Sequence, residues 1–302
     1  MNLVAASIVN KGSLRKGFGL CGRRPPRVAW SLVAMTLLAV FLVALQLSNP
    51  RPVDNPDIED YAQQARALAA GEGMVTRFLG LNGLRYYQQH GLGQDGVWPA
   101  IERYPLHRAV LAGLFGLFGA GDATIPFSSA IWYPLIVALT YLVGWRLIGW
   151  QGGLFAGLLA AFSILLPNAP SGLSEFSSAF LLTAILLLAI GARSPRRFLL
   201  LGMLAGLLVL GKYNQIVFTF PLLAYCFVQG KPRWLSLGAL LLGVGMFTAP
   251  VLAIRSFSRT CREASTRSRR ENGLTSGTLS NPCLRPAPST RWRRWPRGWE
   301  RR

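Results

Sequence analysis

The sequence is short of acidic residues and of charge altogether. It contains 12 Asp and Glu against 32 Lys and Arg, and charged residues make up only 15% of the chain while hydrophobic residues make up 51%. A soluble protein has about 25% charged residues, so this composition indicates that much of the surface does not face water. The scarcity of charge favours a membrane protein over a soluble domain.

Cysteine is scarce as well. The four cysteines have neither a CxxC motif nor metal-ligand spacing. Cys226 falls inside an apolar run, so it is interpreted as a small hydrophobic side chain rather than as a redox or zinc residue.

The positive charge is concentrated at the two ends of the chain. Of the net charge of +20, residues 1–27 carry +6 and residues 255–302 carry +10. Basic flanks around an apolar, nearly neutral middle are typical of a membrane protein and argue against a nucleic-acid partner.

Long apolar runs predict an all-α, polytopic membrane helix bundle. Val28 to Leu47 contains no charge, and its 20 residues match the roughly 30 Å hydrocarbon core of a bilayer. This run is too long for the apolar region of a cleaved signal peptide, and the basic residues before it place the N-terminus in the cytoplasm. About seven spans are expected, the others being near residues 126–145, 150–167, 176–191, 198–211, 214–229 and 234–254.

Three regions are predicted along the chain. Residues 1–27 form a basic cytoplasmic N-terminus, and residues 28–254 form the membrane region, in which 49–108 is a long external loop with short helices. The apolar stretch 109–121 is too short to span and is expected to be re-entrant or interfacial, which places the loop 167–175 on the same external face. His107 and Arg108 are then expected to be interfacial anchors.

Residues 255–302 form a tail rich in Arg, Ser, Thr and Pro, with no apolar periodicity. Such a segment buries too little surface to offset its ordering entropy, so disorder is expected. Its abrupt onset favours a translated wrong reading frame or a truncated gene end over a tail that binds lipid surfaces.

Acidic residues gather in "NPDIEDYAQQ", residues 55–64. Asn55 as N-cap, Pro56 in the first turn and Gly71 at the end predict a helix, with an apolar stripe suited to the membrane surface. Asp57, Asp60 and Tyr61 lie close together on it by helical spacing. Acids in a first turn also complement the helix dipole, so a purely structural role remains an alternative.

The order of these motifs resembles the GT-C superfamily of glycosyltransferases, which use polyprenyl-phosphate sugars. The resemblance is to the dolichyl-phosphate-mannose–protein mannosyltransferases and the aminoarabinose transferases. It rests on the Asp and Tyr of the first loop, on "LRYYQQ" and "ERYPLHRAVLAGLFGLFGAG", on "SGLSEFSSAFLL", and on "LLLGMLAGLLVLGKYN". Tyr104 departs from the pattern, because relatives have a Pro there, and relatives continue with further helices.

The resemblance implies a site residue by residue. Asp57 is the candidate catalytic base, with Asp60 next, since a carboxylate is needed to take the proton of an acceptor hydroxyl. Arg103 stands where the family has a Lys and is expected to hold the donor phosphate. Glu175 occupies the position of a second acid, and substrate-binding roles are expected for the remaining candidates, Tyr61 and Lys212.

The predicted function is a multi-pass glycosyltransferase of the inner cell membrane. It moves a sugar from a polyprenyl-phosphate carrier in the bilayer to a hydroxyl of an unknown protein, lipid or glycan on the external face. No cofactor is assigned, although the three acids of one loop leave a divalent metal ion open. The alternatives are a transporter or flippase without catalysis, and an inactive fragment of such a transferase.

Overall fold

The computed structural model describes residues 26–48, 56–76, 98–99 and 105–249, and within these the chain is almost entirely helical. The predicted all-α membrane bundle is confirmed. The exceptions to helix include two short strands, β1 (Val75–Thr76) and β2 (Trp98–Pro99), which pair antiparallel with Val75 opposite Pro99.

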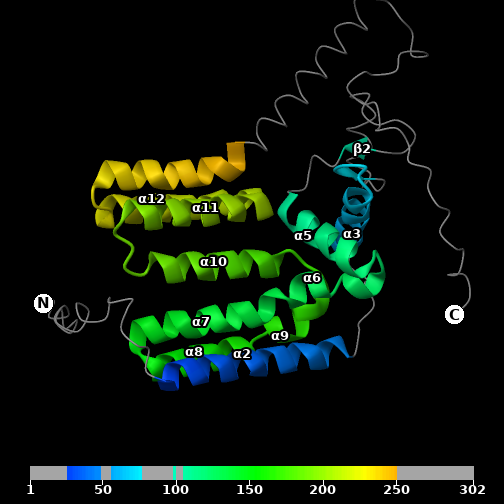
Figure 1. Cartoon of the computed structure of the whole chain (residues 1–302), viewed down its shortest axis with the longest axis horizontal. Coiled ribbons are helices and arrows are strands. Elements are labelled where there is room, and N and C mark those ends of the chain that lie inside the picture. The colour runs from blue at the N-terminus through cyan, green and yellow to red at the C-terminus, as the bar shows by residue number, and fades with distance from the viewer. Residues whose placement is uncertain (1–25, 49–55, 77–97, 100–104, 250–302) are drawn as a thin grey trace, which may run out of the picture.

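The helices of the bundle lie side by side, with α2 (Pro26–Leu47) at one edge and the helix Arg233–Ala249 at the other (Figure 1). The remaining bundle helices are α7 (Trp132–Ile148), α8 (Trp150–Ala161), α10 (Glu175–Ala189), α11 (Pro195–Gly211) and α12 (Thr219–Gln229). Short elements connect them, namely η1 (Asp122–Thr124), α6 (Phe127–Ala130), α9 (Leu165–Asn168), η2 (Ala169–Ser171) and η3 (Tyr213–Phe218).

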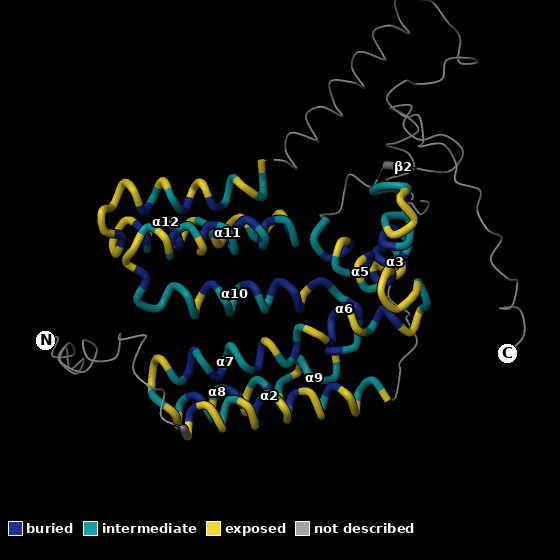
Figure 2. Tube along the Cα trace, viewed as in Figure 1, coloured by how far each residue is buried: buried dark blue, intermediate teal, exposed yellow. Residues whose placement is uncertain are grey.

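Many residues of the outer helices are exposed (Figure 2), and large apolar side chains are among them, as expected where lipid replaces water. On α2, Trp30 is 74% exposed and Phe41 59% exposed, whereas Ala39 on the opposite face is fully buried. The inner face of α2 packs on α7, where Tyr133 and Tyr141 are completely buried.

Small residues bring neighbouring helices into close contact. A Cβ added to Gly144 of α7 would lie 2.5 Å from the carbonyl oxygen of Gly152 on α8, and one added to Gly202 of α11 would lie 2.1 Å from that of Leu240. Close backbone approach through small residues is how helices associate in membranes, where apolar burial gives no drive toward association.

The count of about seven spans is not reached by the helices of the described residues. By length and composition, Arg27–Leu47 and Asp122–Ile148 qualify as spans, and a third is obtained if Trp150–Ala161 and Leu165–Ser171, which are bent by 50°, are taken together. Helix ends and turns shorten two of the predicted runs: α10 ends before Gly191 at φ +73°, and the 3₁₀ turn η3 takes the first residues of the run 214–229.

Helices α3 (Pro56–Ala69) and α5 (Pro105–Phe118) pack on each other across one end of the bundle (Figure 1). The predicted helix is confirmed: it includes Pro56 and ends before Gly71, which has φ +78°. Asn55 lies outside the described residues. The expectation that the apolar stripe of this helix lies on the membrane surface is wrong, because Ile58, Ala62 and Ala65 are buried against α5 and its neighbours.

Candidate functional site

The second turn of α3 meets the ends of three other helices where the α3–α5 pair contacts the bundle. The hydroxyl of Tyr61 on α3 lies 3.5 Å from that of Ser174, the residue before α10. At the end of α11, a Cβ on Gly211 would lie 3.7 Å from Leu106 of α5 and 3.6 Å from Ser178 of α10. The loops 49–108 and 167–175, far apart in sequence, therefore contribute to one site.

Asp57 lies in the first turn of α3, one turn before Tyr61, and is exposed. An acidic side chain at this position complements the partial positive charge of the helix N-terminus. The next turn of the same helix contacts Ser174 through Tyr61, and that contact is buried.

Asp60 has a different environment. Its Oδ1 accepts a hydrogen bond of 2.5 Å from Nε2 of Gln64 and one of 3.3 Å from the hydroxyl of Thr76. Gln64 in turn accepts a hydrogen bond from the guanidinium of Arg108, and the side chains of Gln64, Thr76 and Arg108 are all buried. Asp60 thus belongs to a polar network that holds α3, β1 and α5 together.

Glu175 and Lys212 form an ion pair between Oε1 and Nζ at the end of the bundle. Glu175 begins α10 and Lys212 directly follows α11, and their side chains are 55% and 30% exposed. An exposed pair of this kind contributes little to stability, so both groups remain available to a charged ligand. The structure brings together two of the residues that the sequence proposed as substrate-binding.

Arg103, the candidate phosphate-binding residue, lies outside the described residues. Among the described residues, no group of three or more His, Cys, Asp or Glu side chains is arranged to hold a metal ion.

His107 and Arg108 are buried, each only 1% exposed, so the expectation that they anchor the helix at the membrane interface is wrong. Nε2 of His107 lies 2.9 Å from the carbonyl oxygen of Gly172, and its ring meets the ring of Tyr61 edge-on with centroids 5.1 Å apart. Burial lowers the pKa of His107 to about 4, so the ring is neutral at physiological pH. By helical spacing, His107 and Arg108 lie on the face of α5 that also carries Leu111 and Phe115. This spacing was the signal in the sequence that could have indicated their burial.

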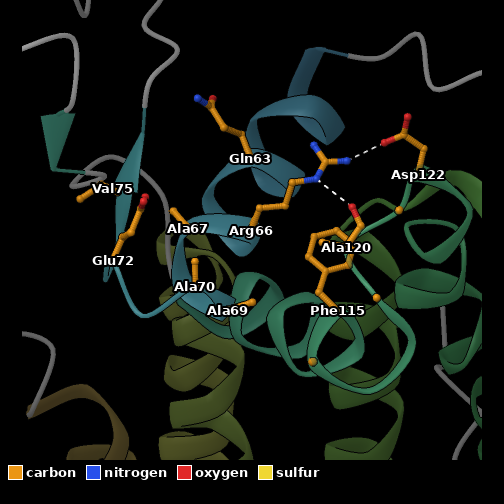
Figure 3. Close-up of a pocket in the computed structure, with 13 residues that line it drawn as sticks. Gln63, Arg66, Ala67, Ala69, Ala70, Glu72, Val75, Phe115, Ala120 and Asp122 are labelled. Atoms are coloured by element: carbon orange, nitrogen blue, oxygen red, sulfur yellow. Dashed lines mark hydrogen bonds and ion pairs between the residues drawn. The ribbon is translucent and has the colours of Figure 1, made fainter. Parts of the chain in front are cut away.

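A cavity of about 740 Å³ lies on another face of α3, formed with the last turns of α5 (Figure 3). Gln63, Arg66, Ala67 and Ala70 line it, and none of the sequence-predicted site residues does. Arg66 spans its edge, donating to Asp122 at 2.5 Å and to the carbonyl oxygen of Ala120 at 3.2 Å. These contacts tie the end of α3 to the turn after α5.

The fold and the clustered helix ends define a membrane helix-bundle protein with a polar site at one end. The family model for dolichyl-phosphate-mannose-protein mannosyltransferases matches residues 102–254, about half of the chain. The chain therefore belongs to this family, which is of the GT-C type and points to glycosyltransferase activity in general. The match includes Glu175 and Lys212, whereas Asp57 precedes it. No curated protein and no solved structure matches the chain.

Proposed function

We propose that this protein transfers a sugar from a polyprenyl-phosphate carrier in the membrane to an acceptor hydroxyl, with Asp57 as the catalytic base. One observation carries the proposal: the contact between Tyr61 and Ser174 places the turn of α3 that follows Asp57 beside the start of α10, where Glu175 pairs with Lys212. A carboxylate and a cation near one another are what this reaction needs.

The proposed step moves one proton and one sugar. The Asp57 carboxylate takes the proton of the acceptor hydroxyl as its oxygen forms a bond to the anomeric carbon. The bond between that carbon and the carrier phosphate breaks, and its electron pair leaves with the polyprenyl phosphate. Direct attack from the opposite side inverts the configuration of the anomeric carbon.

The carrier phosphate bears one negative charge in the donor and gains a second as its bond to the anomeric carbon breaks, so cationic groups suit it. Lys212 is the described cation of the site, and an ammonium group binds phosphate through charge-assisted hydrogen bonds. We assign Arg103 the same role from its place in the sequence, and Glu175 and Tyr61 the lining of the substrate pocket. Asp60 is assigned to holding α3 in place, because Gln64 and Thr76 both donate to it.

The charges of the site support a transferase rather than a transporter. Glu175 is at the start of α10 and Lys212 directly follows α11, so both lie at helix ends instead of midway along a span. Transporters mark their pathway with charged groups and helix breaks near the middle of the membrane. We place the site on the external face of the cell membrane because the basic N-terminal residues 1–27 favour a cytoplasmic N-terminus.

The test compares Asp57→Asn with Glu59→Gln, which neutralises another exposed acid of the same helical turn. Membranes containing each variant receive a radiolabelled mannosyl polyprenyl phosphate, and label that has left the donor is measured. Loss of a general base lowers the rate about 100- to 10,000-fold, whereas Glu59→Gln is expected to behave as wild type. Undiminished transfer by Asp57→Asn would rule out the base assignment, and no transfer by the wild type would rule out the proposed function.

A further inference from the structure

The ring of His107 contacts both segments that carry the proposed carboxylates. On one side it meets the ring of Tyr61, which follows Asp57 by one turn of α3, at an interplanar angle of 74°. On the other side its Nε2 bonds the carbonyl oxygen of Gly172, three residues before Glu175. With 1% of its surface exposed, the ring cannot touch a substrate.

The contacts of His107 define its protonation state. A carbonyl oxygen only accepts, so Nε2 carries the hydrogen, and in a neutral ring Nδ1 is then unprotonated. Nδ1 is buried and has no hydrogen-bond partner among the described residues. Burial is the main cause that lowers the pKa of His107, and the charges of Lys212 and Arg108 lower it further; the hydrogen bond to Gly172 and the charge of Glu175 act in the opposite direction and are outweighed. His107 is therefore a fixed hydrogen-bond donor rather than a proton carrier.

Both backbone polar groups of Gly172 form hydrogen bonds. Its N–H donates to the hydroxyl of Ser129 at 2.7 Å, while its carbonyl oxygen accepts from His107. Its φ of +75° is suited to glycine, and a Cβ there would lie 2.8 Å from Ile125 and 3.2 Å from Ile58 of α3. The loop before α10 is thus packed directly against the first turn of α3, and His107 bonds the residue at that contact.

We propose that His107 is a positioning residue, which fixes the separation between Asp57 on α3 and the Glu175–Lys212 pair by joining Tyr61 to the carbonyl group of Gly172. This inference rests on the proposed function. The two parts of the side chain have separate roles: the Nε2–H bonds the loop before α10 at Gly172, and the ring packs against Tyr61 in the second turn of α3.

Catalytic groups must be held closely for transfer, and a displacement of about 1 Å lowers a rate about 100-fold. His107→Phe keeps a flat ring against Tyr61 but loses the donor, so its kcat is expected to fall about 10- to 100-fold. His107→Gln returns an N–H donor near the position of Nε2 and is expected to restore most of the lost rate. The KM for the donor should change little in both variants, because Lys212 is retained.

Two measurements separate positioning from other roles. Phe115→Leu removes buried volume from the same helix face, where Phe115 is 4% exposed, and serves as a control of matched stability. It is expected to keep the kcat of the wild type. The pH dependence of kcat/KM is expected to keep its acid limb in His107→Gln, since His107 gives up no proton in the reaction. Loss of that limb would make His107 a proton carrier and overturn the proposal.

A distance measurement tests the geometry without relying on transfer. Spin labels are placed at Glu59→Cys on α3 and Asn168→Cys on α9, both exposed positions, in the full chain with its native cysteines replaced by alanine. Pulsed electron paramagnetic resonance is expected to give a broader or shifted distance distribution in His107→Phe. In His107→Gln the distribution is expected to match that of the labelled protein with His107. An unchanged distribution in His107→Phe would overturn the proposal. If these distributions behave as expected while the wild type transfers no sugar, only the proposed function fails.

Discussion

The hydroxyl of Tyr61 lies 3.5 Å from the hydroxyl of Ser174, although the two residues are 113 positions apart in the chain. Tyr61 belongs to the helix pair at the end of the bundle, and Ser174 is the residue from which α10 starts. The contact therefore joins a polar segment to a membrane helix. It makes one site of groups that the linear sequence keeps separate.

Lys212→Gln is expected to weaken binding of the polyprenyl-phosphate donor. The cation at the end of α11 provides charge-assisted hydrogen bonds to phosphate, and loss of one such bond raises the KM for the donor by about tenfold or more. The kcat should fall as well, because the phosphate gains negative charge as its bond to the anomeric carbon breaks and Lys212 would stabilise that charge. Steady-state kinetics with varied donor concentration measures both.

Lys231→Gln is the matched control for this variant, because Lys231 is an exposed lysine in the connector at the opposite end of α12 from Lys212. It should leave the KM unchanged. An unaltered donor KM together with an unaltered kcat in Lys212→Gln would show that Lys212 only pairs with Glu175.

Gly172→Ala is expected to destabilise the protein more than Gly119→Ala. Both glycines have positive φ, +75° and +91°, so alanine costs about 1–2 kcal/mol at either position. Only at Gly172 would the new Cβ also meet neighbours, with Ile125 at 2.8 Å, whereas nothing lies within 4 Å at Gly119. Melting temperatures in mild detergent compare the two, and equal losses would contradict the packing seen at Gly172.

The local signals of the sequence predicted individual helices well. Pro56 and Gly71 bracket α3, and the charge-free run from Val28 to Leu47 became α2 with nearly the same bounds. These elements are determined by nearby residues, through turn chemistry and continuous hydrophobicity. The expectation that the loops 49–108 and 167–175 lie on the same face is consistent with the contact between Tyr61 and Ser174.

The partners of these helices were not predictable in the same way. An apolar stripe on α3 has the same pattern whether it faces lipid or another helix, and the choice of α5 depends on contacts distant in sequence. Similarly, a His–Arg pair beside an apolar run is read as interfacial, because burial of Arg108 is tolerable only with a partner such as Gln64. That partner lies 44 residues away.

Gly202→Ala is expected to separate α11 from the helix Arg233–Ala249. The added methyl group would lie 2.1 Å from the carbonyl oxygen of Leu240, and backbone cannot move aside as a side chain does. Overpacking of this kind costs about 1–3 kcal/mol. Gly245→Ala is the control, because nothing lies within 4 Å of its added Cβ and alanine favours helix. Thermal unfolding in detergent should show a lower melting temperature for Gly202→Ala alone. Similar melting temperatures for the two variants would refute close packing of these helices.

Stability should depend on pH through His107. Its folded pKa of about 4 is below the usual value of 6.5, so between these values the unfolded chain binds a proton that the folded chain does not. Stability is therefore unaffected above about pH 7, falls as the pH drops from 6.5 to 4, and has then lost roughly 3 kcal/mol from this group. The apparent melting temperature of the full chain in detergent, measured from pH 4 to pH 8, follows this loss.

His107→Gln isolates the contribution of the imidazole, because glutamine keeps an N–H near Gly172 but does not titrate in this range. The variant is expected to lose much less stability than the wild type when the pH is lowered from 7 to 4. An equal fall in melting temperature for both proteins would mean that His107 is solvated or paired in the folded state. A smaller fall in the variant requires a buried, neutral ring, as its contacts with Gly172 and Tyr61 imply.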